Sequence, residues 1–174
     1  MKKYLLKGGF VVDGETREVK IADVLVADGI VAEIGENLNA DGAETVDCTG
    51  LYVTAGFVDA HVHTESSMVL PEEFGRAVLP HGTTAMITDP HEIVNVAGAK
   101  GLREYLDRIH MSPADLFVVV PSCVPATPLD TNGAGKFLAE DMKEFVDRKE
   151  VVGLGEVMSY YDVVDGNPEI LDKI

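Results

Sequence analysis

Two histidines one residue apart are the first sign of chemistry in this sequence. His61 and His63 end an apolar run, residues 56–63. Alternate residues of a β-strand share a face, so the two imidazoles are predicted to point to the same side of a sheet. Two neutral imidazoles on one wall form half of a site for a divalent metal ion. A His-x-His pair alone is a weak signal, because two unrelated polar side chains give the same pattern.

Two further polar stretches also follow apolar runs. The first is Asp89-Pro90-His91-Glu92, for which a proline turn leading into a capped helix is the alternative interpretation. The second, residues 121–128, contains three prolines and is otherwise interpreted as a stiff connector. It includes Ser122 and Cys123, and Cys123 is disfavoured as a nucleophile because no base is identifiable beside it.

An acidic residue within an apolar run completes the set. Glu156 lies in residues 153–158, where burial of a carboxylate is costly unless the group is paired or binds a metal. Its alternative role is that of an ordinary acid that supports a metal ligand. From the residues alone, His61 and His63 are candidate metal ligands, and Glu156 is expected to be either paired with another group or bound to a metal.

From residue 56 onward, apolar runs alternate with stretches of helical periodicity, which is the pattern of βα units with a parallel sheet. The continuous apolar content of the runs favours strands covered on both faces. Parallel strands of a barrel bring their carboxyl ends to one rim, so the polar stretches are expected on that rim. The expected strands are residues 56–63, 83–88, 116–120 and 151–158. Three helices are expected between them: one opens at Pro71, one includes residues 102–109 and one includes residues 138–146.

The ends of the sequence have other patterns. Residues 1–54 contain short apolar runs interrupted by Asp13-Gly14 and Asp28-Gly29, pairs that favour tight hairpins, so a small β-rich, sandwich-like module is expected. Residues 55–174 then form four βα units, the last helix being capped by Asn167 and opened by Pro168. Four units cannot close an eight-stranded TIM-like barrel, so the chain is expected to be part of a longer protein.

Charge and cysteine content narrow the class of protein. The 174 residues include 30 Asp and Glu against 14 Lys and Arg, a formal net charge of −16, which disfavours nucleic acid and anionic membrane surfaces as partners. Cys48 and Cys123 are too few for a disulfide framework. Neither a secretory signal nor a long apolar span is recognised, so a cytoplasmic location is expected.

The same stretches resemble a known family. Residues 54–63 are similar to the first-strand signature of the amidohydrolase superfamily, although Ala55 stands where many members have proline. Glu65-Ser66-Ser67-Met68, residues 81–96 and residues 121–128 resemble the adenine deaminase branch. Most superfamily members have a carboxylated lysine on the fourth strand, whereas adenine deaminases resemble this chain in having a glutamate, here Glu156. The resemblance extends over residues 6–174.

The resemblance implies hydrolysis of adenine to hypoxanthine and ammonia in purine salvage, by a hydroxide that two divalent cations activate. Manganese is the expected metal, with iron as the alternative, and Glu156 is the expected bridging ligand beside His61 and His63. Ser122 is expected to contact the purine. Side chains expected to serve catalysis are Glu65, Asp89, His91 and Glu92. Further ligands and an aspartate belong to later strands, so this stretch alone is expected to be inactive, and the whole protein is expected to be a homo-oligomer.

Two alternatives remain. The chain could belong to another amidohydrolase, dihydroorotase-like or deacetylase-like, which would share the His-x-His strand. It could also be a non-catalytic remnant that binds a partner through an open sheet edge. Glu156, together with the polar stretches that follow the second and third strands, favours the adenine deaminase interpretation over the first alternative.

Overall fold

The computed structural model describes residues 2–127, 129, 130 and 132–174; Pro128, which belongs to the proline-rich stretch, lies outside the described residues. The described chain divides into two compact units, Met1–Ala55 and Gly56–Ile174. This division falls one residue after the boundary expected from the sequence. Within the described ranges, no helix has the length and apolar character needed to cross a membrane.

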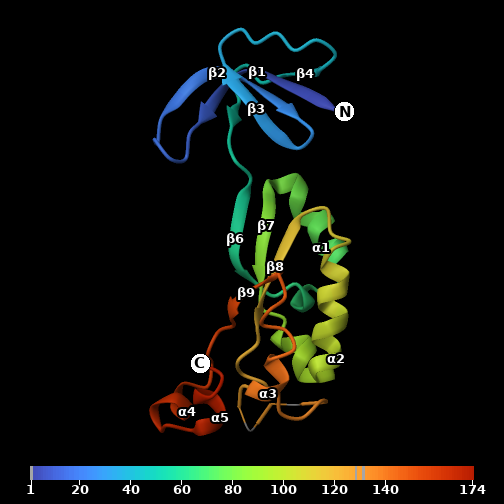
Figure 1. Ribbon diagram of the computed structural model, residues 1–174, viewed down its shortest axis with the longest axis vertical. Coiled ribbons are helices and arrows are strands. Elements are labelled where there is room, and N and C mark those ends of the chain that lie inside the picture. Colours follow the sequence, from blue (N-terminus) through green and yellow to red (C-terminus); the bar gives the residue numbers. More distant parts are fainter. Residues whose placement is uncertain (1, 128, 131) are drawn as a thin grey trace. The chain divides into compact units, whose positions relative to one another are not determined.

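The first unit is a β-sheet, as Figure 1 shows. Its strands among the described residues are β1 (Lys3–Val12), β2 (Val19–Ala27), β3 (Ile30–Gly35), β4 (Glu44–Asp47) and β5 (Tyr52–Val53). Strand β1 pairs antiparallel with β2 and parallel with both β4 and β5, and β3 pairs antiparallel with β2. Val11, Ala22 and Val24 form its small buried core.

One of the two expected hairpin turns is confirmed and the other is wrong. Asp28 and Gly29 alone connect the paired residues Ala27 and Ile30, with φ values of 53° and 81°. A two-residue turn with positive φ at both positions matches the right-handed twist of the strands. Asp13-Gly14 instead opens a longer loop, since Val12 pairs with Val19. The Asp13 carboxylate accepts hydrogen bonds from the amides of residues 15 and 16, which stabilises this wider turn.

The Asp28-Gly29 turn generates a stability prediction. Replacing Gly29 with alanine should destabilise the protein by about 1–2 kcal/mol, because an L-residue is strained at positive φ. Steric overlap does not contribute, since no described atom lies within 4 Å of the added Cβ. Gly14→Ala is the matched control, equally open and outside the positive-φ region, and should not destabilise. Urea unfolding measures both; equal losses in the two variants would contradict the prediction.

The second unit contains a parallel sheet in the order β6-β7-β8-β9 among the described residues. Its strands are β6 (Phe57–Val62), β7 (Thr83–Thr88), β8 (Asp115–Val120) and β9 (Val151–Leu154). Its helices are α1 (Pro71–Val78), α2 (His91–Ile109), α3 (Ala139–Met142), α4 (Tyr160–Val164) and α5 (Pro168–Leu171), with short 3-10 turns η1 (Glu65–Ser67) and η2 (Leu79–His81). Figure 1 shows α1 and α2 along one side of this sheet.

Several element boundaries differ from expectation. Strand β9 ends at Leu154, not at residue 158, so Glu156 lies in a loop. The amide of Gly155 still donates to the Val120 carbonyl (2.7 Å), but the amide of Glu156 donates to a side chain, which ends the ladder. Helix α3 ends at Met142, and irregular turns follow in which the amides of Phe145 and Val146 both donate to the Met142 carbonyl.

The helices differ at other positions too. Helix α2 begins at His91, well before the residues 102–109 expected to be helical. It is kinked at Gly98, whose φ is 61°. Helix α4 was not expected from the sequence. The expected cap of the last helix is confirmed, because the Asn167 side chain accepts a hydrogen bond from the Glu169 amide (3.1 Å).

The expectation that both faces of the parallel sheet are covered is wrong for the described chain. Met86, Val118 and Val120 pack against Leu102 and Leu106 of α2 in the main core. Alternate residues point the other way, and burial along β8 alternates accordingly. Among the described residues, the helices that contribute to this core therefore cover one face.

A buried hydrogen bond ties α2 to the segment that follows β6. The Tyr105 hydroxyl lies 2.6 Å from Oγ1 of Thr64, and Thr64 directly follows His63. Burial raises the pKa of Tyr105 to about 12. The phenol is therefore neutral throughout the physiological range and holds the chain next to the histidine pair.

This contact predicts a pH dependence of stability. Between pH 10 and 12 the unfolded chain releases the Tyr105 proton that the folded chain retains. The free energy of unfolding should therefore fall as pH rises, by up to about 1.4 kcal/mol per pH unit. Tyr105→Phe should remove this contribution, and at pH 8 it should cost about 1 kcal/mol because Thr64 loses its partner.

Urea unfolding at pH 8 and pH 11 measures both effects. Tyr161→Phe is the control, because Tyr161 is 80% exposed. An unchanged pH dependence in Tyr105→Phe would contradict the assignment.

Candidate metal centre

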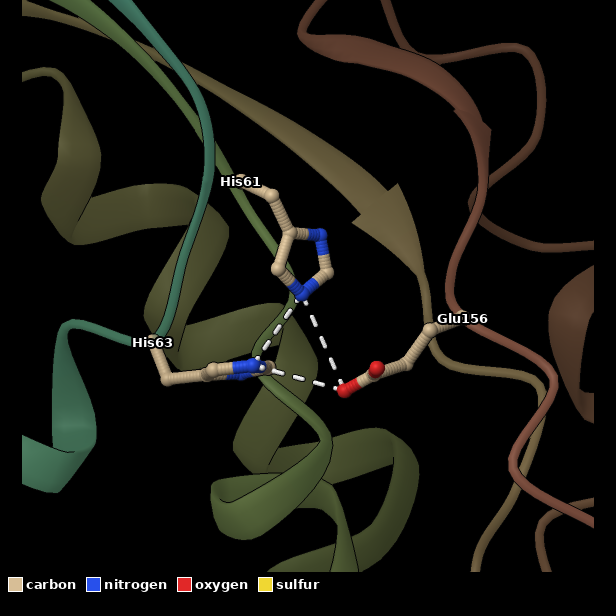
Figure 2. Close-up of side chains that lie close together, drawn as sticks. All are labelled: His61, His63 and Glu156. Atoms are coloured by element: carbon tan, nitrogen blue, oxygen red, sulfur yellow. Dashed lines mark hydrogen bonds and ion pairs between the residues drawn. The ribbon is translucent and has the colours of Figure 1, made fainter.

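His61, His63 and Glu156 converge on one point, as Figure 2 shows. The two Nε2 atoms of the histidines lie 3.1 Å apart. Oε1 of Glu156 lies 3.7 Å from Nε2 of His61 and 3.4 Å from Nε2 of His63. One ligand atom from each residue falls within 4.8 Å of the others. The structure thus brings together the three residues that the sequence singled out as metal ligands.

The parallel sheet explains this convergence. His61 lies in β6 and His63 directly after it, while Glu156 follows β9 by two residues. The carboxyl ends of parallel strands share one edge of the sheet, so residues from the first and last strands reach the same rim. The pairing between β6 and β7 continues one step further, because the amide of Asp89 donates to the Val62 carbonyl (3.1 Å).

One hydrogen bond fixes the tautomer of His63. Its Nδ1 lies 2.8 Å from the carbonyl oxygen of Asp89, and a carbonyl can only accept, so Nδ1 carries the proton. In the neutral ring the lone pair is then on Nε2, which faces Glu156. Two imidazole nitrogens and a carboxylate oxygen are a donor set that suits divalent cations such as manganese, iron or zinc. The residues present therefore fit a metal ion.

Asp89 holds two residues of this centre at once. Its carbonyl accepts from His63, and Oδ2 of its carboxylate accepts from the Glu156 amide at 2.9 Å. The side chain is buried, its Oδ1 has no hydrogen-bond partner within the described ranges, and burial raises the pKa of Asp89. A Cβ on Gly155 would lie 2.4 Å from Oδ2, so a side chain at that position would displace the carboxylate.

His91 lies beside the three-residue group. Its Nε2 is 3.7 Å from Oε1 of Glu156, and its ring packs edge-on against His63 with centroids 4.7 Å apart. The residue begins helix α2, which places it on the same rim as the end of β7. Of the residues expected to serve catalysis, His91 is thus in direct reach of the Glu156 carboxylate.

Glu65 of η1 and Glu92 at the start of α2 form a separate acidic pair. Oε1 of Glu65 accepts from the Glu92 amide (3.2 Å), and Oε1 of Glu92 accepts from the Ser66 hydroxyl (2.7 Å). Oε2 of Glu65 is buried with no partner among the described residues, and burial raises the pKa of Glu65. Both glutamates lie outside the three-residue group of potential ligands.

Ser122 and Cys123 are buried behind Glu156. The Ser122 hydroxyl donates to the Glu156 carbonyl at 2.6 Å. The sulfur of Cys123 accepts from the amides of Met158 (3.0 Å) and Ser159 (3.4 Å). The role of Cys123 was missed from the sequence, and so was that of Gly155. A glycine directly before an acid within an apolar run was the available signal for Gly155.

Comparison with known proteins agrees with this geometry. Residues 52–172 match the model of the amidohydrolase family. The chain is 44% identical over 170 residues to the adenine deaminase of Bacillus velezensis and to adenine deaminase 2 of Carboxydothermus hydrogenoformans; each alignment covers 98% of this chain but 29% of the relative. The dihydropyrimidinase of Brevibacillus agri has a similar fold, with a TM-score of 0.62 and 21% identity over 87% of this chain and 32% of that one.

These likenesses confirm the fold expected from the sequence, βα units of a TIM-like barrel preceded by a β-rich module. The family implies a divalent metal, and the His61, His63 and Glu156 group could bind one. Since the matching region includes more than half of the residues and all three potential ligands, the chain belongs to the amidohydrolase family of metal-dependent hydrolases.

Proposed function

We propose that the whole protein is an adenine deaminase, which hydrolyses adenine to hypoxanthine and ammonia in purine salvage. The observation that carries this proposal is the convergence of two histidines on a glutamate, Glu156, in a chain 44% identical to adenine deaminases. The chain spans 29% of the length of these relatives. A cytoplasmic location is supported by the free thiols of Cys48 and Cys123, which are typical of a reducing compartment. A homo-oligomeric state stays a prediction.

We assign His61, His63 and Glu156 as ligands of two divalent cations, manganese in the first place and iron as the alternative. A carboxylate has two oxygens, which supports Glu156 as the residue that both cations share. When bound, the cations would lower the pKa of water enough to supply a hydroxide near neutral pH for attack on the amine-bearing carbon of the purine.

The protein's own residues supply orientation and proton handling. Asp89 keeps the proton of His63 on Nδ1 and leaves Nε2 as a ligand. His91, 3.7 Å from the Glu156 carboxylate, is assigned to contact with the purine or its leaving group. The amine leaves readily when it is protonated, so a proton donor is needed nearby. Glu65, whose pKa is raised by burial, and Glu92 are assigned to the rim that supplies it.

The contacts of two residues favour roles different from those first expected. Two polar contacts of Asp89, through its carbonyl and its carboxylate, hold potential ligands, which supports positioning as its role. The Ser122 hydroxyl donates a hydrogen bond to the Glu156 backbone carbonyl, so we assign Ser122 to support of Glu156 instead of contact with the purine.

A different amidohydrolase activity is the second candidate. The fold likeness to a dihydropyrimidinase is compatible with it, but at 21% identity that likeness concerns the fold alone. A glutamate at position 156, where most superfamily members have a lysine, favours adenine as substrate. A non-catalytic remnant would bind adenine and metal no better than an unrelated protein.

The test is substrate turnover by the whole protein. With manganese it should release ammonia from adenine, and Glu156→Gln should lower kcat/KM by about 100-fold or more because an oxygen ligand is lost. Glu140→Gln is the control, since Glu140 is 80% exposed and paired with Lys143. Turnover of dihydroorotate or acetylated sugars without turnover of adenine would overturn the proposal.

A further inference from the structure

Glu156 must be held by something other than the sheet. Strand β9 ends two residues before Glu156, and the Glu156 side chain is 40% exposed. Ordinary packing therefore does not fix where its carboxylate points. The backbone around it is fixed instead by side chains of residues that lie far away in the sequence.

We propose that Ser122 and Cys123 are positioning residues that aim the Glu156 carboxylate at the two histidines. The inference deepens the proposed function and rests on it, because the carboxylate is taken to be a metal ligand. Ser122 holds the Glu156 carbonyl (2.6 Å), and Cys123 holds the amides of Met158 (3.0 Å) and Ser159 (3.4 Å).

The topology gives these two residues their task. Strands β8 and β9 are neighbours, and their ladder ends with Gly155 N donating to Val120 O. Beyond that point the backbone groups of the Glu156 loop need other partners, since a buried unpaired group is costly. Ser122 and Cys123 lie two and three residues after the end of β8 and supply a donor and an acceptor in turn. The Asp89 carboxylate completes the set by accepting from the Glu156 amide.

The supporting residues are themselves immobilised. Ser122 and Cys123 are 1% and 3% exposed. The ammonium of Lys173 donates to the Ser122 carbonyl at 2.7 Å, and burial lowers the pKa of this lysine. The Ser159 hydroxyl donates to the Ala126 carbonyl at 3.2 Å, which adds a further link between the loops after β8 and β9. A carboxylate carried on a loop tied at several points loses little freedom when it binds a cation.

Manganese affinity is the readout that tests the proposal, measured in the whole protein from the EPR signal of unbound Mn²⁺. Ser122→Ala and Cys123→Ala should each raise the Kd for Mn²⁺ about 10- to 100-fold, as expected for residues that orient a ligand. Cys123→Ser keeps an acceptor on a shorter bond and should give an intermediate Kd. Lys136→Met is the matched control and should leave the Kd unchanged. Lys136 lines a cavity of about 340 Å³ together with Ser122 and Cys123, but it pairs with the exposed Glu169.

A double-mutant comparison separates positioning from general support of the fold. If the two residues act through the carboxylate, Ser122→Ala should add little further loss of Mn²⁺ affinity in a Glu156→Gln background. Losses that add fully would show an independent structural effect and overturn the inference. The unfolding midpoint of each metal-free variant identifies any that fails to fold, and Cys123→Ser then carries the test: weaker Mn²⁺ binding supports the proposal and unchanged binding contradicts it.

The failures of the two proposals are distinguishable. If the unmodified protein binds no Mn²⁺, the metal centre and the proposed function fall together. If it binds Mn²⁺ and Glu156→Gln weakens binding, but the Ser122 and Cys123 variants bind as the unmodified protein does, the positioning role alone is overturned.

Discussion

The arrangement of the candidate metal centre depends on Asp89, which bonds to two of the three potential ligands. Its carbonyl accepts from Nδ1 of His63, and its carboxylate accepts from the amide of Glu156. The carboxylate is buried beside a glycine that leaves room for it. Burial of an acid with one oxygen unpaired is costly. The structure accommodates that cost at the residue where the ends of β6, β7 and β9 are joined.

The parallel sheet makes this joining possible. The strands lie side by side in sequence order and run parallel, so the polar stretches that follow them meet at one edge of the sheet. Helix α2 contributes at two positions, with His91 beside Glu156 at its start and Tyr105 bonded to Thr64 further along. The rim is therefore fixed by bonds that cross between strands and by the helix that packs beneath it, since α2 belongs to the same hydrophobic core as β7 and β8.

Short sequence patterns predicted the features that depend only on neighbouring residues. The spacing of His61 and His63 is enough to place both on one side, and Asp28-Gly29 is enough to predict a tight turn, as the φ values confirm. Asp13-Gly14 has the same letters, yet its aspartate bonds to the following amides and widens the turn. The choice between the two turns depends on side-chain contacts that the dipeptide alone does not reveal.

Non-local contacts account for what the sequence could not predict. The apolar run through residue 158 suggested a strand, but β9 ends where Asp89 and Ser122 replace the neighbouring strand as partners of the backbone. These partners lie 67 and 34 residues away in the sequence. Periodicity contains no information about such contacts. The sequence therefore predicted that Glu156 would lie near the two histidines, but not that it would lie in a loop.

The two ligands held by Asp89 differ in what they require of it. His63 is oriented by a backbone carbonyl, which every residue at position 89 would possess, whereas the Glu156 amide needs the carboxylate itself. The histidine side of the centre therefore depends on the path of the chain after β7. The glutamate side depends on side-chain identity at Asp89, Ser122 and Cys123. Chemical variation at the centre is thus more restricted around the glutamate than around the histidines, because each of its supports is a particular functional group.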